Sequence, residues 1–177
     1  MPTANPAPTM LAVQSPYRDA KIVLFGAPYD GTTSYRPGTR FGPSAIRRES
    51  YGLETYSPQQ DADLDGAPIH DLGDLDLPFG GPETPLSMIR ETTEELLADG
   101  KTPVMLGGEH LVTLGAVQAL SRRYPDLHIL HFDAHTDLRE DYVGQRLSHA
   151  TVLRRCHDLL GDGRIFQLGI RSGLREE

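Results

Sequence analysis

Short apolar segments alternate with stretches of helical apolar spacing along most of this chain, and this alternation limits the folds open to it. Apolar runs of strand length occupy residues 21–26, 102–106, 128–132 and 164–170, with a further candidate strand near 68–70. Helical spacing occupies residues 42–49, 85–99, 111–123 and 148–160. Strands that alternate with helices build βαβ units, whose strands run parallel. The pattern therefore predicts an α/β fold of three layers, a mostly parallel sheet with helices on both faces.

The chain has the size of one domain with a short N-terminal extension. Of its 177 residues, 1–19 are rich in proline and alanine and show no apolar period, so they predict a flexible arm. Residues 20–177 then form the domain. A single cysteine, Cys156, lies on the apolar stripe of the last helix, where a core role is expected. One cysteine cannot form an internal disulfide, which favours a reducing compartment and a cytoplasmic location.

The net charge of the chain argues against two classes of binding partner, nucleic acids and anionic membranes. The 17 lysines and arginines against 25 acidic residues give a net charge of −8, so no basic surface is expected for nucleic acid or an anionic membrane. No apolar run approaches the ~18 residues of a membrane span.

The run from His131 to Asp137 carries the strongest chemical signal. Asp133, His135 and Asp137 follow an apolar strand at spacings of two, and carboxylates mixed with imidazole favour Mn, Fe(II) or Zn. In an extended strand the two aspartates would lie ~13 Å apart, so a compact site requires the chain to curl. The alternative is a polar loop with no ligand. His131 shares the strand parity of Asp133 but precedes the strand end, so it is expected to be a hydrogen-bonded buried histidine.

Two further histidines lie at predicted helix starts, and the first of them is at the same edge of the predicted sheet as Asp133–Asp137. His110 ends the run Gly107-Gly108-Glu109-His110 after one strand, at the start of a helix. His149 follows Ser148, a candidate helix cap, and in a first helical turn the helix dipole would favour a neutral imidazole suited to proton transfer. Taken alone, His110 is also typical of an ordinary glycine-rich turn, and His149 of an incidental surface histidine.

Together these residues resemble the ureohydrolases, the family of arginase and agmatinase. The resemblance rests on Gly107–His110 and His131–Asp137, and the amino-acid sequence of the second run is most similar to that of the agmatinase branch. It extends to further segments, which are residues 26–30, 36–38, 42–47 and 167–172. The arginase-type Ser-Gly-Asn-x-His-Gly run is absent from the sequence, which favours a decarboxylated substrate such as agmatine.

The resemblance implies a binuclear manganese hydrolase that converts a small cationic guanidinium compound, agmatine, to putrescine and urea. It implies that His110 and Asp137 hold one Mn²⁺, that His135 holds the other, and that Asp133 bridges them. His149 aligns with the family's proton-shuttling histidine, and a homo-oligomer is expected for a complete domain.

The sequence also departs from the family pattern. The second carboxylate motif, Asp-x-Asp-x-x-Asp-Pro, and a later glutamate do not occur in it, so the domain is expected to be incomplete on its C-terminal side. The alternatives are a relative acting on formiminoglutamate or guanidinobutyrate, or a non-catalytic remnant.

Overall fold

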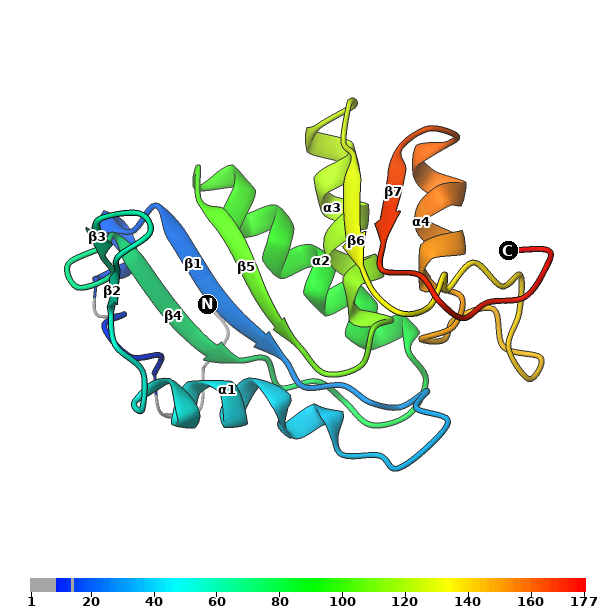
Figure 1. Cartoon of the computed structure of the whole chain (residues 1–177), viewed down its shortest axis with the longest axis horizontal. Helices are drawn as coiled ribbons and strands as arrows, with labels where there is room; N and C mark the ends of the chain where they lie inside the picture. Colours follow the sequence, from blue (N-terminus) through cyan, green and yellow to red (C-terminus); the bar gives the residue numbers. More distant parts are fainter. Residues whose placement is uncertain (1–8, 14) are drawn as a thin grey trace.

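The computed structural model describes residues 9–13 and 15–177 (Figure 1). The strands are β1 Ile22–Ala27, β2 Tyr56–Ser57, β3 Ala62–Asp63, β4 Ile69–Asp74, β5 Thr102–Gly107, β6 Ile129–Phe132 and β7 Ile165–Leu168. The helices are α1 Gly42–Ser50, α2 Glu83–Ala98, α3 Val112–Arg123 and α4 Val152–Leu160, with 3-10 turns η1 Tyr17–Asp19 and η2 Thr39–Phe41. Among the described residues, no helix has both the length and the apolar character needed to cross a membrane. The predicted α/β class is confirmed.

The strands form separate sheets where one sheet was predicted. β4, β1 and β5 pair in parallel in that order, and β6 pairs in parallel with β7. In the described part of the chain no hydrogen bonds join β5 to β6, so each presents an open edge toward the other. The short antiparallel pair β2–β3 was not predicted, because two-residue strands in a polar stretch carry no apolar alternation.

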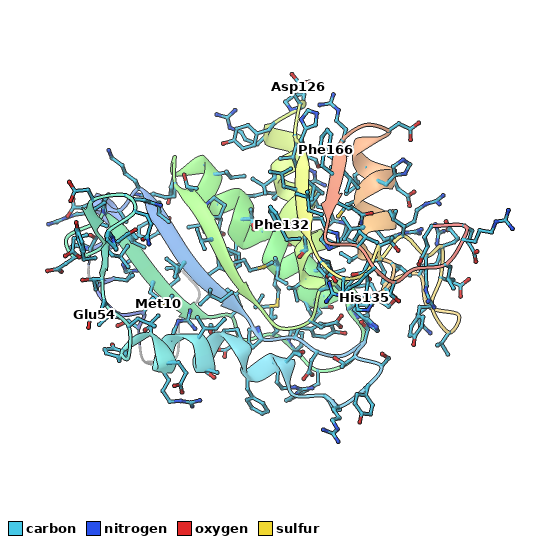
Figure 2. All side chains as sticks on the ribbon, in the orientation of Figure 1. Met10, Glu54, Asp126, Phe132, His135 and Phe166 are labelled. Atoms are coloured by element: carbon cyan, nitrogen blue, oxygen red, sulfur yellow. The ribbon has the colours of Figure 1, made fainter. Side chains whose placement is uncertain are left out.

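Helices cover the sheets unequally (Figure 1). α2 and α3 pack on one face of β4–β1–β5 and α1 lies on the other, as predicted for a three-layer fold. The β6–β7 pair is covered by α3 and α4 on one face, where Ile129 and Ile165 join the core. Its opposite face is open and carries exposed apolar side chains, which are Leu130, Phe132, Phe166 and Leu168 (Figure 2).

Two clusters of buried apolar residues form the core. One lies between β1 and α2 and contains Phe25 and Ile89, and the other lies between α3, α4 and the buried face of β6–β7. Cys156 belongs to the second cluster and is fully buried, and burial raises the pKa of its thiol to about 12. Its predicted core role is confirmed.

The segment before β1 differs from the predicted flexible arm where the structure describes it. Residues 1–8 and 14 lie outside the described residues. The Met10 N–H donates to Asp71 Oδ2 at 3.0 Å, the Leu11 N–H donates to Ser50 Oγ at 2.9 Å, and Val13 is buried. These bonds use backbone donors, which exist whatever the side chain, so the sequence pattern did not reveal them.

A buried ion pair fixes α1 against the sheet. The side chain of Arg47 is fully buried and donates to both carboxylate oxygens of Asp71 at 2.8 Å, and it also pairs with Asp74. Burial alone would raise the pKa of Asp71, but the hydrogen bonds from Arg47 and from the Gly73 and Met10 amides hold it below its usual range. Asp71 is therefore charged at neutral pH, and α1 and β4 share a satisfied ion pair.

Removing Arg47 should destabilise the fold strongly. Arg47→Ala leaves the Asp71 carboxylate buried without its cation, which typically costs about 3–5 kcal/mol of unfolding free energy. Urea unfolding followed by circular dichroism would measure it. The matched control is Arg48→Ala, because Arg48 is exposed and, within the described part of the chain, pairs only with Glu49, so a far smaller change is expected. Equal losses in the two variants would contradict the assignment.

The same pair predicts an acid dependence of stability. A carboxyl whose pKa is lowered in the folded state stabilises the fold above its unfolded pKa of ~3.9, and this contribution is lost as pH falls through the folded value. Urea midpoints should therefore fall between about pH 5 and pH 3 more steeply in the wild type than in Arg47→Ala. Parallel curves would exclude Asp71 as a source of the acid sensitivity.

Candidate metal centre

The loops that follow β1 and β5 are held together by backbone contacts at the carboxyl ends of both strands. The Gly108 N–H donates to Ala27 O at 2.9 Å, and the Glu109 N–H donates to Tyr29 O at 2.8 Å. A Cβ at Gly108 would lie 2.1 Å from Tyr29 O, so only glycine permits this approach. The two residues after Gly108, Glu109 and His110, are thereby placed at the same edge of the sheet.

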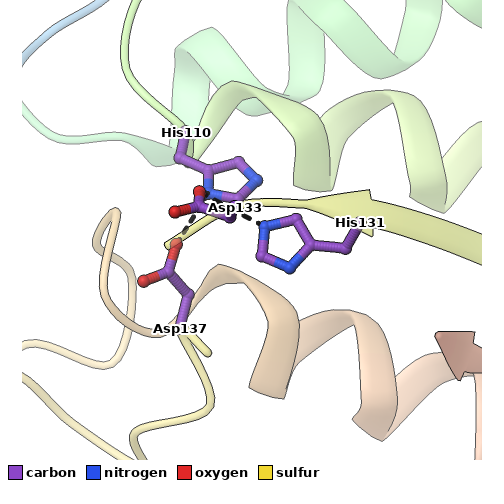
Figure 3. Close-up of side chains that lie close together, drawn as sticks. All are labelled: His110, His131, Asp133 and Asp137. Carbon is purple, nitrogen blue, oxygen red and sulfur yellow. Dashed lines mark hydrogen bonds and ion pairs between the residues drawn. The ribbon is translucent and has the colours of Figure 1, made fainter. Parts of the chain in front are cut away.

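Four side chains converge at this edge, one from the turn after β5, one from the end of β6 and two from the loop after β6 (Figure 3). The ligand atoms of His110, His131, Asp133 and Asp137 all lie within 4.8 Å of one another. His110 Nδ1 is 2.7 Å from Asp137 Oδ2 and 3.8 Å from Asp133 Oδ2. Neighbouring ligands of a cation with bonds near 2.1 Å lie roughly 3 Å apart, which is close to these spacings.

The chain curls after β6, as the compact site requires. Asp137 adopts a positive φ of 53°, a conformation that costs a non-glycine residue of order 1 kcal/mol or more. Its carbonyl oxygen accepts hydrogen bonds from the Leu153 and Arg154 amides at 3.0 and 3.2 Å. The start of α4 thus stabilises the strained residue, whose carboxylate turns back toward His110 and Asp133.

His131 is the member of the cluster that was expected to be a hydrogen-bonded buried histidine. Gln167 Nε2 donates to Thr136 O at 2.6 Å and contacts His131 Nδ1 at 3.1 Å. Because a carbonyl only accepts, the nitrogen of the Gln167 amide faces this pair, so His131 Nδ1 is the acceptor. The proton of the neutral ring then sits on Nε2, and burial, followed by nearby His110, lowers the pKa of His131 and favours that neutral form.

His131 Nε2 nevertheless differs from the expectation, since it is buried and has no hydrogen-bond partner among the described residues. Asp133 Oδ2 lies 3.4 Å from it. A protonated Nε2 cannot bind a metal ion but can donate to a carboxylate that does, so this geometry favours His131 as a neighbour of a metal ligand. The parity of His131 and Asp133 along β6 is the sequence signal for this contact.

His135 lies outside the group of four but beside Asp133. Its side chain is exposed, and His135 Nδ1 is 3.3 Å from Asp133 Oδ1. The His135 N–H also donates to Oδ1 at 2.9 Å. The two oxygens of Asp133 therefore face different imidazoles, with Oδ2 toward His110 and Oδ1 toward His135. The role of His135 as a ligand stays a prediction.

Imidazole and carboxylate groups around one small volume fit a divalent cation such as Mn²⁺. Burial alone would raise the pKa of Asp133, but the His135 amide and the nearby imidazoles hold it below its usual range. A charged carboxylate flanked by a neutral imidazole donor is the state that a metal site requires. The donor chemistry of these residues therefore fits the group that the resemblance implies.

His149 is placed differently from the expected first helical turn. α4 begins at Val152, and residues 148–151 form a turn in which Thr151 Oγ1 accepts the Ser148 N–H at 3.0 Å. His149 therefore precedes the helix, and the dipole argument does not apply to it. The residue instead contacts the loop after β1, where His149 Nδ1 lies 2.8 Å from Thr32 O.

A cavity of about 490 Å³ opens beside His149. Its lining includes Tyr29, Thr32, Ser34 and Tyr142. The Tyr142 ring meets the His149 ring edge-on at 5.4 Å, and Ser34 Oγ lies 3.4 Å from His149 Nε2. The volume falls within the ~300–1,000 Å³ of small-molecule sites.

A model of the arginase family matches residues 20–177. The chain belongs to the arginase family. It is 50% identical over 167 residues to the agmatinase of Bacillus subtilis (strain 168), covering 94% of this chain and 58% of that protein. It is 46% identical over 160 residues to the N(1)-aminopropylagmatine ureohydrolase of Thermococcus kodakarensis, covering 89% of this chain and 54% of that protein.

Solved structures share the arrangement of strands and helices. The agmatine ureohydrolase of Thermoplasma volcanium superposes with a TM-score of 0.87 at 40% identity, covering 96% of this chain and 56% of that structure. The arginase-like fold expected from the resemblance is thus confirmed. The chain spans between 54% and 58% of the length of these relatives.

Metal binding by the cluster can be measured directly. We expect the chain to bind Mn²⁺ in calorimetric titration, and His110→Ala and Asp133→Ala each to weaken binding at least tenfold, since changes even beside a ligand cost about 10–100-fold. The control is His128→Ala, because His128 is exposed, lies before β6 and contacts Asp126 O at 2.8 Å and the Phe166 ring, not the cluster. We also expect His135→Ala to weaken binding more than His131→Ala. The reverse order would make His131 the ligand.

Proposed function

We propose that this chain carries the part of an arginase-family active site that binds manganese and moves protons, and that the reaction is hydrolysis of a guanidinium compound. The observation that carries the proposal is the convergence of His110, Asp133 and Asp137 at the carboxyl ends of parallel strands. Ligands of open α/β sheets gather at that edge. The likeness to an agmatinase at 50% identity supports the class of reaction.

In this proposal His110 and Asp137 hold one Mn²⁺, His135 holds a second, and Asp133 bridges them. The support is the orientation of Asp133, whose two oxygens face the two different imidazoles. A pair of such ions, when bound, supplies Lewis-acid activation of water and of the guanidinium carbon.

His149 is the proposed proton carrier. The reaction joins the oxygen of water to the guanidinium carbon and breaks the bond from that carbon to the alkyl nitrogen, which gives urea and an amine. Water gives up both of its protons as its oxygen becomes the carbonyl oxygen of urea, and the leaving nitrogen takes up two and departs as an ammonium group. His149 Nε2, which lies 3.4 Å from Ser34 Oγ of the cavity lining, can accept one of these protons and pass it on, which is the role of a general acid–base group.

Agmatine is the substrate we propose, with putrescine and urea as products. The net charge of −8 favours a cationic ligand, and the sequence lacks the Ser-Gly-Asn-x-His-Gly run that grips an amino-acid head group in arginases. Guanidinobutyrate and formiminoglutamate carry a carboxylate, which the same charge disfavours. The one described cysteine is buried and free, which supports a reducing, cytoplasmic location.

Urea release from agmatine in the presence of Mn²⁺ tests the proposal. Any release by the 177-residue chain should be lost in Asp133→Ala, and equal rates in the two would contradict catalysis by this chain. The residue roles are tested in a chimera in which residues 20–177 replace the matching part of the Bacillus subtilis agmatinase.

In that chimera we expect His149→Gln to lower kcat about 10²–10⁴-fold, the usual contribution of a general acid–base group. His128→Gln should leave kcat unchanged, because His128 is exposed and lies at the opposite end of β6. An active chimera in which His149→Gln has no effect would remove His149 from the mechanism. An active chimera that prefers guanidinobutyrate would correct the substrate.

A further inference from the structure

We propose that Glu109 and Thr32 are positioning residues that fix the tautomer of His149, with the proton on Nδ1 and Nε2 unprotonated. The inference rests on the proposed role of His149 in proton transfer. It explains how the fold keeps Nε2, the nitrogen that would take up the proton, in its unprotonated form.

Glu109 anchors the arrangement. Its side chain is buried, with 6% of the residue exposed, and Oε1 accepts two hydrogen bonds from Thr32. One comes from the Thr32 N–H at 2.8 Å and the other from the Thr32 hydroxyl at 2.6 Å. Among the described residues Glu109 has no ion-pair partner, so Thr32 supplies its shortest contacts. A carboxylate only accepts, so the Thr32 hydroxyl proton must point at Glu109.

Thr32 in turn determines which atoms of His149 act as hydrogen-bond donors. With its proton committed, Thr32 Oγ1 presents lone pairs, and it accepts the His149 N–H at 3.1 Å. Thr32 O faces His149 Nδ1 at 2.8 Å. A backbone carbonyl can only accept, so Nδ1 must carry a proton. In the neutral ring Nε2 then carries no proton, and it lies 3.4 Å from Ser34 Oγ, a residue of the cavity lining.

The contacts form one directed chain from a buried carboxylate to an imidazole. Each donor in this chain has one acceptor. No donor and acceptor can exchange roles without the loss of a hydrogen bond to a carbonyl or carboxylate oxygen, because these oxygens only accept. The Tyr142 ring, edge-on at 5.4 Å, limits rotation of the imidazole. Nε2 can therefore gain and lose a proton while Nδ1–H stays bonded, which is the requirement for a proton carrier with a fixed tautomer.

The tautomer of His149 can be determined by NMR in the absence of metal and substrate. We would record long-range ¹⁵N–¹H spectra of the 177-residue chain about two pH units above the ordinary histidine pKa of ~6.5, with His149 assigned by the signal lost in His149→Gln. We expect a pyrrole-type Nδ1 and a pyridine-type Nε2. A protonated Nε2 in the wild type would overturn the proposal outright.

Two matched pairs of variants then test the positioning. Thr32→Val removes the hydroxyl with little change of shape, and Thr32→Ser keeps it. Glu109→Ala removes the acceptor, and Glu109→Gln keeps an oxygen that can accept both Thr32 bonds. We expect Thr32→Val and Glu109→Ala to shift the His149 signals to those of a tautomer mixture, and the conservative variants to retain the wild-type signals.

Unchanged spectra in Thr32→Val would show that the positioning claim is wrong. If Glu109→Ala loses the dispersed amide spectrum of a folded chain, the Thr32 pair still decides the question. Because no step of the test needs hydrolysis, the two proposals fail separately: an active chimera in which His149→Gln has no effect would contradict the proposed role of His149, and the expected tautomer would still leave this inference standing.

Discussion

The close approach of Gly108 to Tyr29 is the contact on which the rest of the site depends. It brings the turn after β5 against the loop after β1, and backbone hydrogen bonds from Gly108 and Glu109 hold the two segments together. His110 faces the aspartates because it follows Gly108 by two residues. Glu109 reaches Thr32 for the same reason. The lack of a side chain at Gly108 thus positions both His110, a candidate metal ligand, and Glu109, the anchor of the proposed proton carrier.

Much of the fold follows from apolar spacing, and the exceptions have physical causes. Strands and helices with a clear apolar period appear close to their predicted bounds, because burial on one face is what that period encodes. The gap between β5 and β6 was not foreseen, since pairing between strands depends on tertiary placement and not on the pattern within each strand. The residues before β1 were missed because their contacts use backbone N–H groups.

The sequence predicted which residues belong to the candidate site, but it could not predict how these residues are arranged in space. Spacing alone required a curl between Asp133 and Asp137, and the positive φ of Asp137 supplies it. Spacing could not show that His131 and His135 approach different oxygens of Asp133. That distinction depends on Gln167, which lies on β7 and is brought beside His131 only by pairing of the two strands.

The late start of α4 connects the metal centre to His149. Had the helix begun at Ser148, residues 148–151 would follow helical geometry and His149 could not bond both through its amide and through its ring to Thr32. By starting at Val152, the helix leaves those residues in a turn that Thr151 closes. The Leu153 and Arg154 amides, which have no partner within a helix that begins there, donate instead to Asp137 O. The N-terminus of α4 therefore holds Asp137, the strained candidate metal ligand, and leaves His149 in the turn before the helix, so a change that extended α4 toward Ser148 would disturb both groups together.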